Sequence, residues 1–162
     1  MTIAACYLSS EGVVFGADST STMFVKGWGP DATGAEHHYN YAQKVFQVGQ
    51  DSTLGMTMWG LGNVGAISHR TLIAQFADSL LASAAQSVEE VANRWNQFFW
   101  SSYSTQLASI LQRAQQLHQN QSRSADENNE LIWLMERFSG GFCVGGYLAY
   151  DHMPAHFCPI IS

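Results

Sequence analysis

The chain has 162 residues, a length typical of a single domain that can bury a substantial core. Seven lysine and arginine residues against thirteen aspartate and glutamate residues give a formal charge of −6, which excludes the clustered positive charge that nucleic-acid binding needs. Only 12% of the residues are charged, whereas five tryptophans and nine phenylalanines are present. We therefore expect part of the surface to be buried against partner molecules, with self-association as the preferred explanation.

The beginning of the sequence carries no signal for export or membrane insertion. No basic segment precedes the apolar residues 3–8, and this run is too short for a secretory signal or a membrane span. We expect a cytoplasmic protein that makes no use of a membrane. The six histidines and three cysteines show no metal-ligand spacing. The sequence therefore predicts neither a metal nor another cofactor.

A β-hairpin is predicted at the start of the chain. Residues 2–8 and 12–18 are two short apolar runs, and the turn between them contains Gly12, where a positive φ is easiest. Residues 26–40 differ in composition, because glycine, proline, asparagine and aspartate recur through them. Such residues are typical of turns and loops, so we expect a polar loop over this segment.

A second hairpin follows. Residues 43–48 alternate between polar and apolar side chains, which is the period of a strand with one buried face. Residues 54–59 form another apolar run of strand length. The polar segment between them, residues 49–52, has the composition of a turn. The two runs are therefore expected to pair in an antiparallel manner.

Helices are predicted in the middle of the chain. Apolar side chains over residues 63–84 recur at three- and four-residue spacing, which indicates an amphipathic helix. The segment 87–90 has the pattern of a capping box, and it opens a second helix whose apolar face continues to Leu117. Residues 118–130 are polar and are expected to form a loop or a helix end. A short helix is predicted over residues 131–138.

The chain closes with two predicted strands, at residues 141–150 and 156–161, joined by a turn at 151–155. Two hairpins, two adjacent helices and further strands do not give the strand–helix alternation of a parallel sheet. The order favours an α+β fold in which antiparallel sheets carry a helical layer. Because an apolar strand at the very end would leave an exposed edge, we expect the natural fold to continue beyond Ser162.

Thr2 is a candidate catalytic residue. Removal of Met1 would leave Thr2 with a hydroxyl group and a free α-amine, which are a nucleophile and its own base. The α-amine has an ordinary pKa near 8. Such a site also needs a cation near the developing alkoxide and a backbone donor for the oxyanion. Many proteins begin with Met-Thr, so the remaining residues decide whether this interpretation holds.

Lys44 and Asp18 are candidates for the cation and its partner. Of the two lysines, Lys44 precedes a predicted strand, whereas Lys26 lies at the edge of the glycine-rich segment. Asp18 ends an apolar strand, where a carboxylate is costly unless it is paired. We therefore predict an Asp18–Lys44 ion pair. The alternative for Asp18 is a turn-forming residue before Ser19.

Gly60 is the candidate oxyanion donor, because it lies where a predicted strand becomes a helix. A backbone amide at such a junction can face an anion without interference from a side chain. The alternative is a simple helix-entry turn. Met58, two residues earlier, would line a pocket that prefers an apolar residue before the cleaved bond, or it belongs to the core as methionines in apolar strands usually do.

In this order, Thr2, the segment 11–19, Thr22, the segment 44–46 and the pair 59–60 resemble the proteasome β-subunit family. This family includes bacterial proteasome-like peptidases and belongs to the N-terminal nucleophile hydrolases. The resemblance covers essentially the whole chain as one domain, residues 1–162. It implies an αββα sandwich of antiparallel sheets flanked by helices, with the C-terminal part of the fold missing. The loop between Asp18 and Lys44 is longer than is usual in the family.

The resemblance implies a threonine-type endopeptidase, a hydrolase that works inside a proteasome-like ring. Thr2 would be the nucleophile, Lys44 would hold positive charge near its hydroxyl group, and Asp18 would orient Lys44. The Gly60 amide would stabilise the oxyanion. The backbone around Thr22 and Gly60 would bind the substrate, a peptide or unfolded protein, as an added strand.

The resemblance also implies partners. Self-association into rings is expected, and an ATP-dependent unfoldase is a possible partner. Two other functions remain open at this point. The first is a non-catalytic structural subunit of a similar ring, although such a subunit has no need of Thr2, Asp18 and Lys44 together. The second is an N-terminal nucleophile amidase that acts on small amides, which would need a pocket closed by side chains.

Overall fold

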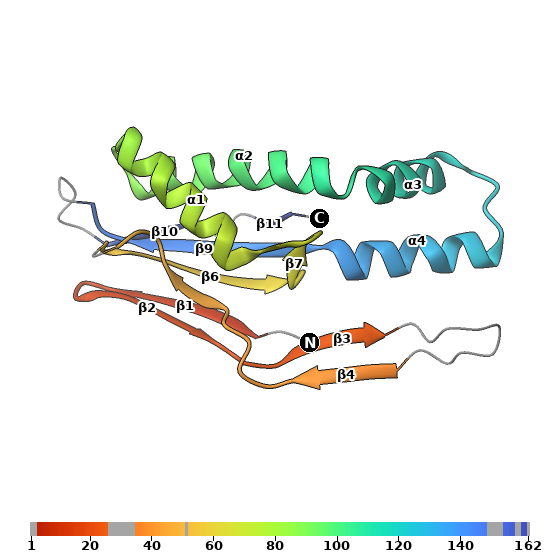
Figure 1. The fold of residues 1–162 in the computed structure, drawn as a ribbon, viewed down its shortest axis with the longest axis horizontal. Helices are drawn as coiled ribbons and strands as arrows, with labels where there is room; N and C mark the ends of the chain where they lie inside the picture. The colour runs from red at the N-terminus through yellow and green to blue at the C-terminus, as the bar shows by residue number, and fades with distance from the viewer. Residues whose placement is uncertain (1–2, 26–34, 51, 149–153, 158–159, 162) are drawn as a thin grey trace.

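The computed structural model describes residues 3–25, 35–50, 52–148, 154–157 and 160–161. Side chains are described in these ranges except at residues 22–25, 35–38, 156–157 and 160–161. The described chain has a mixed α+β fold, as the sequence predicts. Two helices, α1 (His69–Ala82) and α2 (Val88–Gln106), lie above a central sheet, and two further hairpins lie below it (Figure 1).

The central sheet is antiparallel throughout and has the strand order β10-β9-β6-β5. The second predicted hairpin is confirmed, because the two strands that the sequence indicates pair with each other. β9 lies in the middle of the sheet and is also paired with β11. The strands are β5 (Val45–Gln47), β6 (Leu54–Gly60), β9 (Gly140–Gly146), β10 (Ala155–Phe157) and β11 (Ile160–Ile161).

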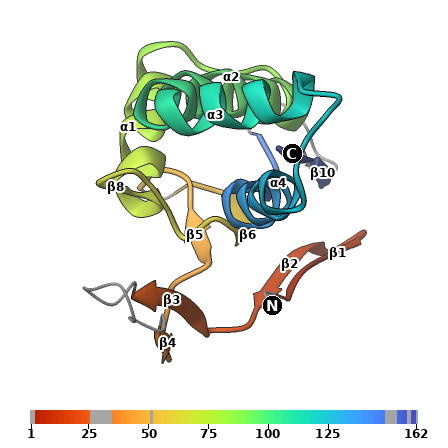
Figure 2. The same cartoon turned by 90° about the vertical axis from the view of Figure 1, so that its right-hand side faces the viewer.

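The first predicted hairpin is also confirmed, as β1 (Ala4–Ser9) and β2 (Gly12–Ala17). It packs on the face of the central sheet opposite the helices (Figure 2). The contact is close because glycines of β6 and β9 face the ring of Phe15. A Cβ atom on Gly55 would lie 2.6 Å from that ring, and one on Gly145 would lie 3.1 Å from it. The absence of side chains there lets the two sheets approach each other.

The prediction of a polar loop over residues 26–40 is wrong for residues 35–39. Ala35–Tyr39 is a strand, β4, which pairs in an antiparallel manner with β3 (Ser21–Val25). Local composition suggested a loop, but the pairing of β4 with a strand earlier in the chain decides its conformation. Strand formation depends on such partners more than on intrinsic propensity. Residues 26–34 lie outside the described part of the chain.

The first helix begins later than predicted. Residues 63–68 form a tight hairpin of β7 (Asn63–Val64) and β8 (Ile67–Ser68), whose turn places Gly65 at a φ of +59°. α1 (His69–Ala82) starts only after this hairpin. The Ser68 side chain accepts a hydrogen bond from the Thr71 N–H at 3.1 Å and so caps the helix.

The predicted second helix is interrupted. α2 (Val88–Gln106) starts after Ser87, whose hydroxyl accepts a hydrogen bond from the Glu90 N–H at 3.0 Å. Glu90 in return accepts a hydrogen bond from the Gln86 N–H rather than from Ser87, so this capping box is shifted by one residue. At Leu107 the backbone leaves the helical region, with φ −111° and ψ 19°, and α3 (Ala108–Gln119) follows.

α4 (Ala125–Phe138) begins inside the segment that was predicted as a loop. Ser124 and Glu127 form a reciprocal capping box, which is a local signal for a helix start that the predicted loop does not include. Arg123 donates hydrogen bonds to the Leu117 and Asn120 carbonyls and so ties the end of α3 to the start of α4. α3 and α4 pack through a small apolar cluster of their own, consisting of Leu117, Leu131 and Leu134.

The main core lies between α1, α2 and the central sheet, and its centre is aromatic. Trp95 of α2 is fully buried. Its ring packs edge-on against Phe142 of β9 at a centroid distance of 5.1 Å and against Phe76 of α1 at 5.2 Å. Phe99 meets Phe142 at 4.6 Å in the same manner. Edge-to-face packing of this kind adds to the stabilisation from buried area, so Trp95 joins both helices to the sheet.

We expect Trp95→Ala to lower the free energy of unfolding by about 3–5 kcal/mol, because it leaves a cavity where two helices and the sheet meet. Trp100→Ala is the matched control on the same helix. Trp100 is half exposed, so its loss should cost less than about 1 kcal/mol. Urea denaturation followed by circular dichroism measures both values, and equal losses would contradict the assignment of Trp95 to the core.

Candidate active site

Asp18 and Lys44 form the ion pair that the sequence predicts. Lys44 Nζ lies 3.0 Å from each carboxylate oxygen of Asp18 and donates a further hydrogen bond of 2.6 Å to the Thr20 carbonyl. The Lys44 side chain is only 8% exposed, and that of Asp18 is 25% exposed. An ammonium group at this depth needs such partners, because burial removes its hydration.

Asp18 also binds the backbone near the start of the chain. Its Oδ1 accepts a hydrogen bond from the Ile3 N–H at 2.8 Å, and its own N–H donates to the Ile3 carbonyl at 3.0 Å. Its Oδ2 accepts a hydrogen bond from the Thr20 N–H at 3.1 Å. The same carboxylate therefore contacts both Ile3 and Lys44. Thr2, which precedes Ile3 in the sequence, lies outside the described residues.

These contacts keep Asp18 ionised. The hydrogen bond from the Ile3 N–H, followed by that from Lys44, holds the pKa of the Asp18 carboxyl below its usual value. Partial desolvation acts in the opposite direction but is outweighed. At neutral pH the site therefore contains an ionised carboxylate in contact with Lys44.

The backbone of Lys44 is anchored to β6. The Lys44 carbonyl accepts hydrogen bonds from the Met58 N–H at 3.0 Å and from the buried Thr57 hydroxyl at 3.1 Å. β6 ends two residues after Met58, at Gly60. The lysine and the candidate oxyanion glycine are thus held by one short piece of hydrogen-bonded sheet.

Gly60 has a backbone that favours glycine, with a φ of +83°. The Leu61 N–H donates to the Ser139 carbonyl of the chain entering β9. Because hydrogen-bonded pairs alternate along an antiparallel ladder, the Gly60 N–H points away from β9, toward the side of β6 on which Lys44 lies. Among the described residues, no hydrogen bond from the Gly60 N–H is present.

His69 is a residue of this region that the sequence analysis did not single out. It is 3% exposed, its Nδ1 lies 2.9 Å from the Gly62 carbonyl, and its ring stacks on Phe99 at 6.0 Å. Desolvation holds the pKa of His69 below its usual value, so the neutral ring donates its Nδ1–H to Gly62. The position of a histidine at the first turn of the helix after Gly60 and Gly62 was the available signal.

The two predicted substrate-binding residues lie in different settings. Thr22 belongs to β3, opposite His38 of β4, and its side chain is not described. Its role in binding a substrate strand stays a prediction. Met58 is 4% exposed and packs in the main core, which favours the alternative assignment of this residue to the core.

The described residues contain no cluster of three or more histidine, cysteine or acidic side chains that could hold a metal ion. Among the same residues, no helix combines the length and the apolar character that a membrane crossing requires. Comparison of the chain with protein-family models, with curated proteins and with solved structures finds no match.

Gly60→Ala should lower the free energy of unfolding by at least about 2 kcal/mol, because the new side chain would be forced into a left-handed backbone. Its Cβ would also lie 2.4 Å from the Ser139 carbonyl oxygen. Gly62→Ala is the control, since its Cβ would meet nothing closer than 3.9 Å. Thermal denaturation of both variants tests this prediction. A Gly60→Ala variant as stable as the native protein would contradict the left-handed backbone at Gly60.

The Asp18 contacts should make stability sensitive to acid. The pKa of Asp18 is lowered in the folded state, so its contribution is fully present above the unfolded value of 3.8 and is lost as pH falls through the folded value. We expect the stability difference between the native protein and Asp18→Asn to be constant above about pH 5 and to shrink below about pH 4. Urea titrations at several pH values measure it, and a difference independent of pH would contradict the ion pair.

Proposed function

We propose that the chain is a threonine-type endopeptidase of a proteasome-like ring complex, in which Thr2 becomes the N-terminal nucleophile once Met1 is removed. The observation that carries this proposal is the double contact of Asp18 Oδ1, which lies 2.8 Å from the Ile3 nitrogen and 3.0 Å from Lys44 Nζ. A buried ammonium group is thereby held next to the residue that follows Thr2. This is where an N-terminal nucleophile needs its cation.

In the proposed reaction, the Thr2 hydroxyl oxygen attacks a peptide carbonyl carbon and its proton passes to the Thr2 α-amine, directly or through a water. An α-amine with a pKa near 8 is a competent base at neutral pH. Lys44 lowers the energy of the developing alkoxide, and Asp18 fixes Lys44 by two hydrogen bonds. The protonated α-amine of Thr2 then gives this proton to the nitrogen of the scissile bond, the C–N bond breaks, and the amine product of the substrate leaves an acyl ester on Thr2. Water then hydrolyses this ester, which releases the acyl product as a carboxylic acid and restores the free hydroxyl group of Thr2.

The Gly60 N–H is the proposed donor to the tetrahedral oxyanion. Its orientation away from β9 and its lack of a described acceptor support this role. An oxyanion-hole donor of this kind typically lowers the barrier by about 3 kcal/mol. His69 supports the loop that follows Gly60, since its Nδ1 lies 2.9 Å from the Gly62 carbonyl.

We further propose that the fold is that of an N-terminal nucleophile hydrolase, an αββα sandwich. Two sheet layers with α1 and α2 on one side are consistent with three of its four layers (Figure 2). The outer face of the β1–β2 hairpin carries Tyr7 and Val14, which are 69% and 64% exposed. A second helical layer over this face would bury them. Large exposed apolar side chains that share one sheet face favour such a covering layer.

The proposed substrates are peptides or unfolded proteins, bound as an added strand along the backbone of β3 around Thr22 and near Gly60. The proposed assembly is a ring of identical subunits in the cytoplasm, with an ATP-dependent unfoldase as a candidate partner. The exposed apolar side chains of the chain, which include Trp133 and Met135 on α4, support self-association.

The decisive experiment combines mass spectrometry with a peptidase assay. We expect the intact mass of the full chain to lack Met1, and we expect fluorogenic peptides to be cleaved. Thr2→Ala should abolish cleavage, and Lys44→Met should reduce it by at least about a hundredfold, because the alkoxide would lose its cation. Thr2→Ser should keep measurable activity, since it retains the hydroxyl group and the amine.

Thr105→Ala is a suitable control for these variants, because Thr105 is exposed on α2. Retention of Met1, or undiminished cleavage by Thr2→Ala, would refute the proposal. Rings without any peptidase activity would instead identify a structural subunit. Hydrolysis of small amides but not of peptides would identify an amidase.

A further inference from the structure

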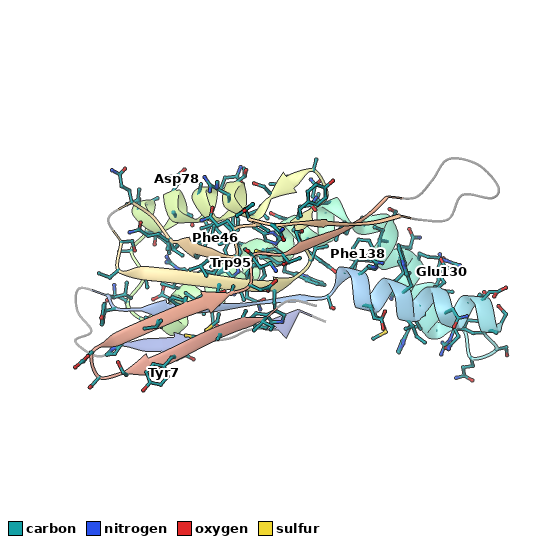
Figure 3. The ribbon with its side chains drawn as sticks, turned by 90° about the horizontal axis from the view of Figure 1, so that it is seen from below. Tyr7, Phe46, Asp78, Trp95, Glu130 and Phe138 are labelled. Atoms are coloured by element: carbon teal, nitrogen blue, oxygen red, sulfur yellow. The ribbon has the colours of Figure 1, made fainter. Side chains whose placement is uncertain are left out.

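A groove lies between α1 and the segment that contains β5. Its volume is about 470 Å³. Its floor is formed by the buried side chains of Phe46, Ile73 and Ala77, whereas its rim on α1 carries the exposed Arg70 and Asp78. Phe46 and Asp78 lie on the same side of the molecule (Figure 3). Neither Asp18, Lys44 nor Gly60 lines the groove.

β5 forms one end of the central sheet, and no other described strand pairs with its outer edge. The Lys44 carbonyl accepts from the Met58 N–H, and the Val48 N–H donates to the Leu54 carbonyl, so these residues face β6. Because the direction of the backbone groups alternates along an antiparallel ladder, the N–H and C=O groups of Val45 and Gln47 point away from β6. The Val45 carbonyl indeed accepts a hydrogen bond from the Gln43 side chain at 2.9 Å, outside the sheet.

The Gln47 N–H, the Gln47 carbonyl and the Val45 N–H therefore have no partner within the described chain. Natural sheet edges are commonly protected by charged side chains, proline or a covering segment. β5 reads Val-Phe-Gln and has no charged residue or proline. A groove with an apolar floor that no described strand covers, beside backbone groups without a partner among the described residues, is the arrangement that accepts an added strand.

The charges on the rim define the occupant. Arg70 contacts Gln43, which precedes β5, whereas Ala77 lies near Gly49, which follows it. The groove is thus positive near the start of β5 and negative, through Asp78, near its end. Asp78 lies eight positions after Arg70 on the helix, a rise of about 12 Å. Five residues of extended chain span nearly the same length, about 13 Å.

We propose that this groove binds an extended peptide segment of a partner protein, which adds to the central sheet antiparallel to β5. In this orientation the segment has a basic side chain at its amino end, beside Asp78, and an acidic side chain at its carboxyl end, beside Arg70. An apolar side chain two residues from each of them lies on Phe46, Ile73 and Ala77. The groove and the proposed catalytic residues are separate, so this inference stands whether or not the chain is a peptidase.

The probe is the peptide acetyl-Lys-Thr-Val-Thr-Glu-amide carrying a fluorophore on a flexible linker, with anisotropy as the readout on the full chain. We expect saturable binding with a dissociation constant below about 1 mM, weak because the peptide is short. The peptide with lysine and glutamate exchanged should bind about two- to fivefold more weakly, and added salt should reduce this preference. N-methylation of every internal amide of the probe should abolish binding, because it removes the donors to β5.

Gln47→Pro is the substitution in the protein that tests the added-strand proposal most directly. It removes the N–H that faces the groove but none of the hydrogen bonds to β6, and proline is tolerated at such edge positions. Gln47→Ala is its matched control, since both variants lose the side-chain hydrogen bond to the Ser52 carbonyl. We expect Gln47→Pro to bind the probe at least about tenfold more weakly than Gln47→Ala.

Equal affinity of Gln47→Pro and Gln47→Ala would overturn the added-strand proposal, as would undiminished binding of the N-methylated peptide. The peptide comparison decides the question if Gln47→Pro does not fold. Absence of saturable binding up to about 1 mM would overturn it as well. A preference for the exchanged peptide would contradict the assigned direction and charge pattern.

Discussion

The Asp18 carboxylate is the contact on which the candidate site depends. It accepts hydrogen bonds from the Ile3 N–H, the Thr20 N–H and Lys44 Nζ, which belong to three separate stretches of chain. Without the carboxylate, the Lys44 ammonium group, whose side chain is only 8% exposed, would lose two of its hydrogen bonds at a depth where water cannot fully replace them. One ionised side chain therefore fixes Ile3 relative to Lys44, which directly precedes β5.

The position of Lys44 relative to Gly60 is fixed by backbone hydrogen bonds rather than by side-chain contacts. The Lys44 carbonyl is bonded to β6, β6 ends at Gly60, and the following loop is held by His69 at the Gly62 carbonyl. His69 is buried against Phe99 and Phe142, which belong to the aromatic core around Trp95. The same packing that joins the helices to the sheet thus supports the loop beside the candidate oxyanion donor. Rigid support of this kind is what preorganised electrostatic sites need.

Much of the fold could be predicted locally. The β1–β2 and β5–β6 hairpins follow from period-two patterns and turn residues, and α2 follows from its cap and apolar periodicity. The strand β4 could not be predicted, because its conformation depends on pairing with β3. The early start of α4 was signalled by Ser124 and Glu127, but the lack of apolar residues obscured it. A helix whose first turns are polar is stabilised by its cap and by the helix beside it.

For the site, the sequence alone determined the kinds of chemistry available. Asp18 at the end of an apolar strand requires a partner, and a chain with only two lysines offers few candidates. Lys44 is the partner that the sequence predicts, and the structure shows this pair. Only the tertiary structure decided that Ile3 shares the same carboxylate and that Gly60 adopts a φ of +83°. It also revealed the open edge of β5 beside α1. The reason is physical: residue types fix charge and hydrogen-bonding capacity, whereas their meeting depends on long-range packing and strand pairing that no local pattern encodes.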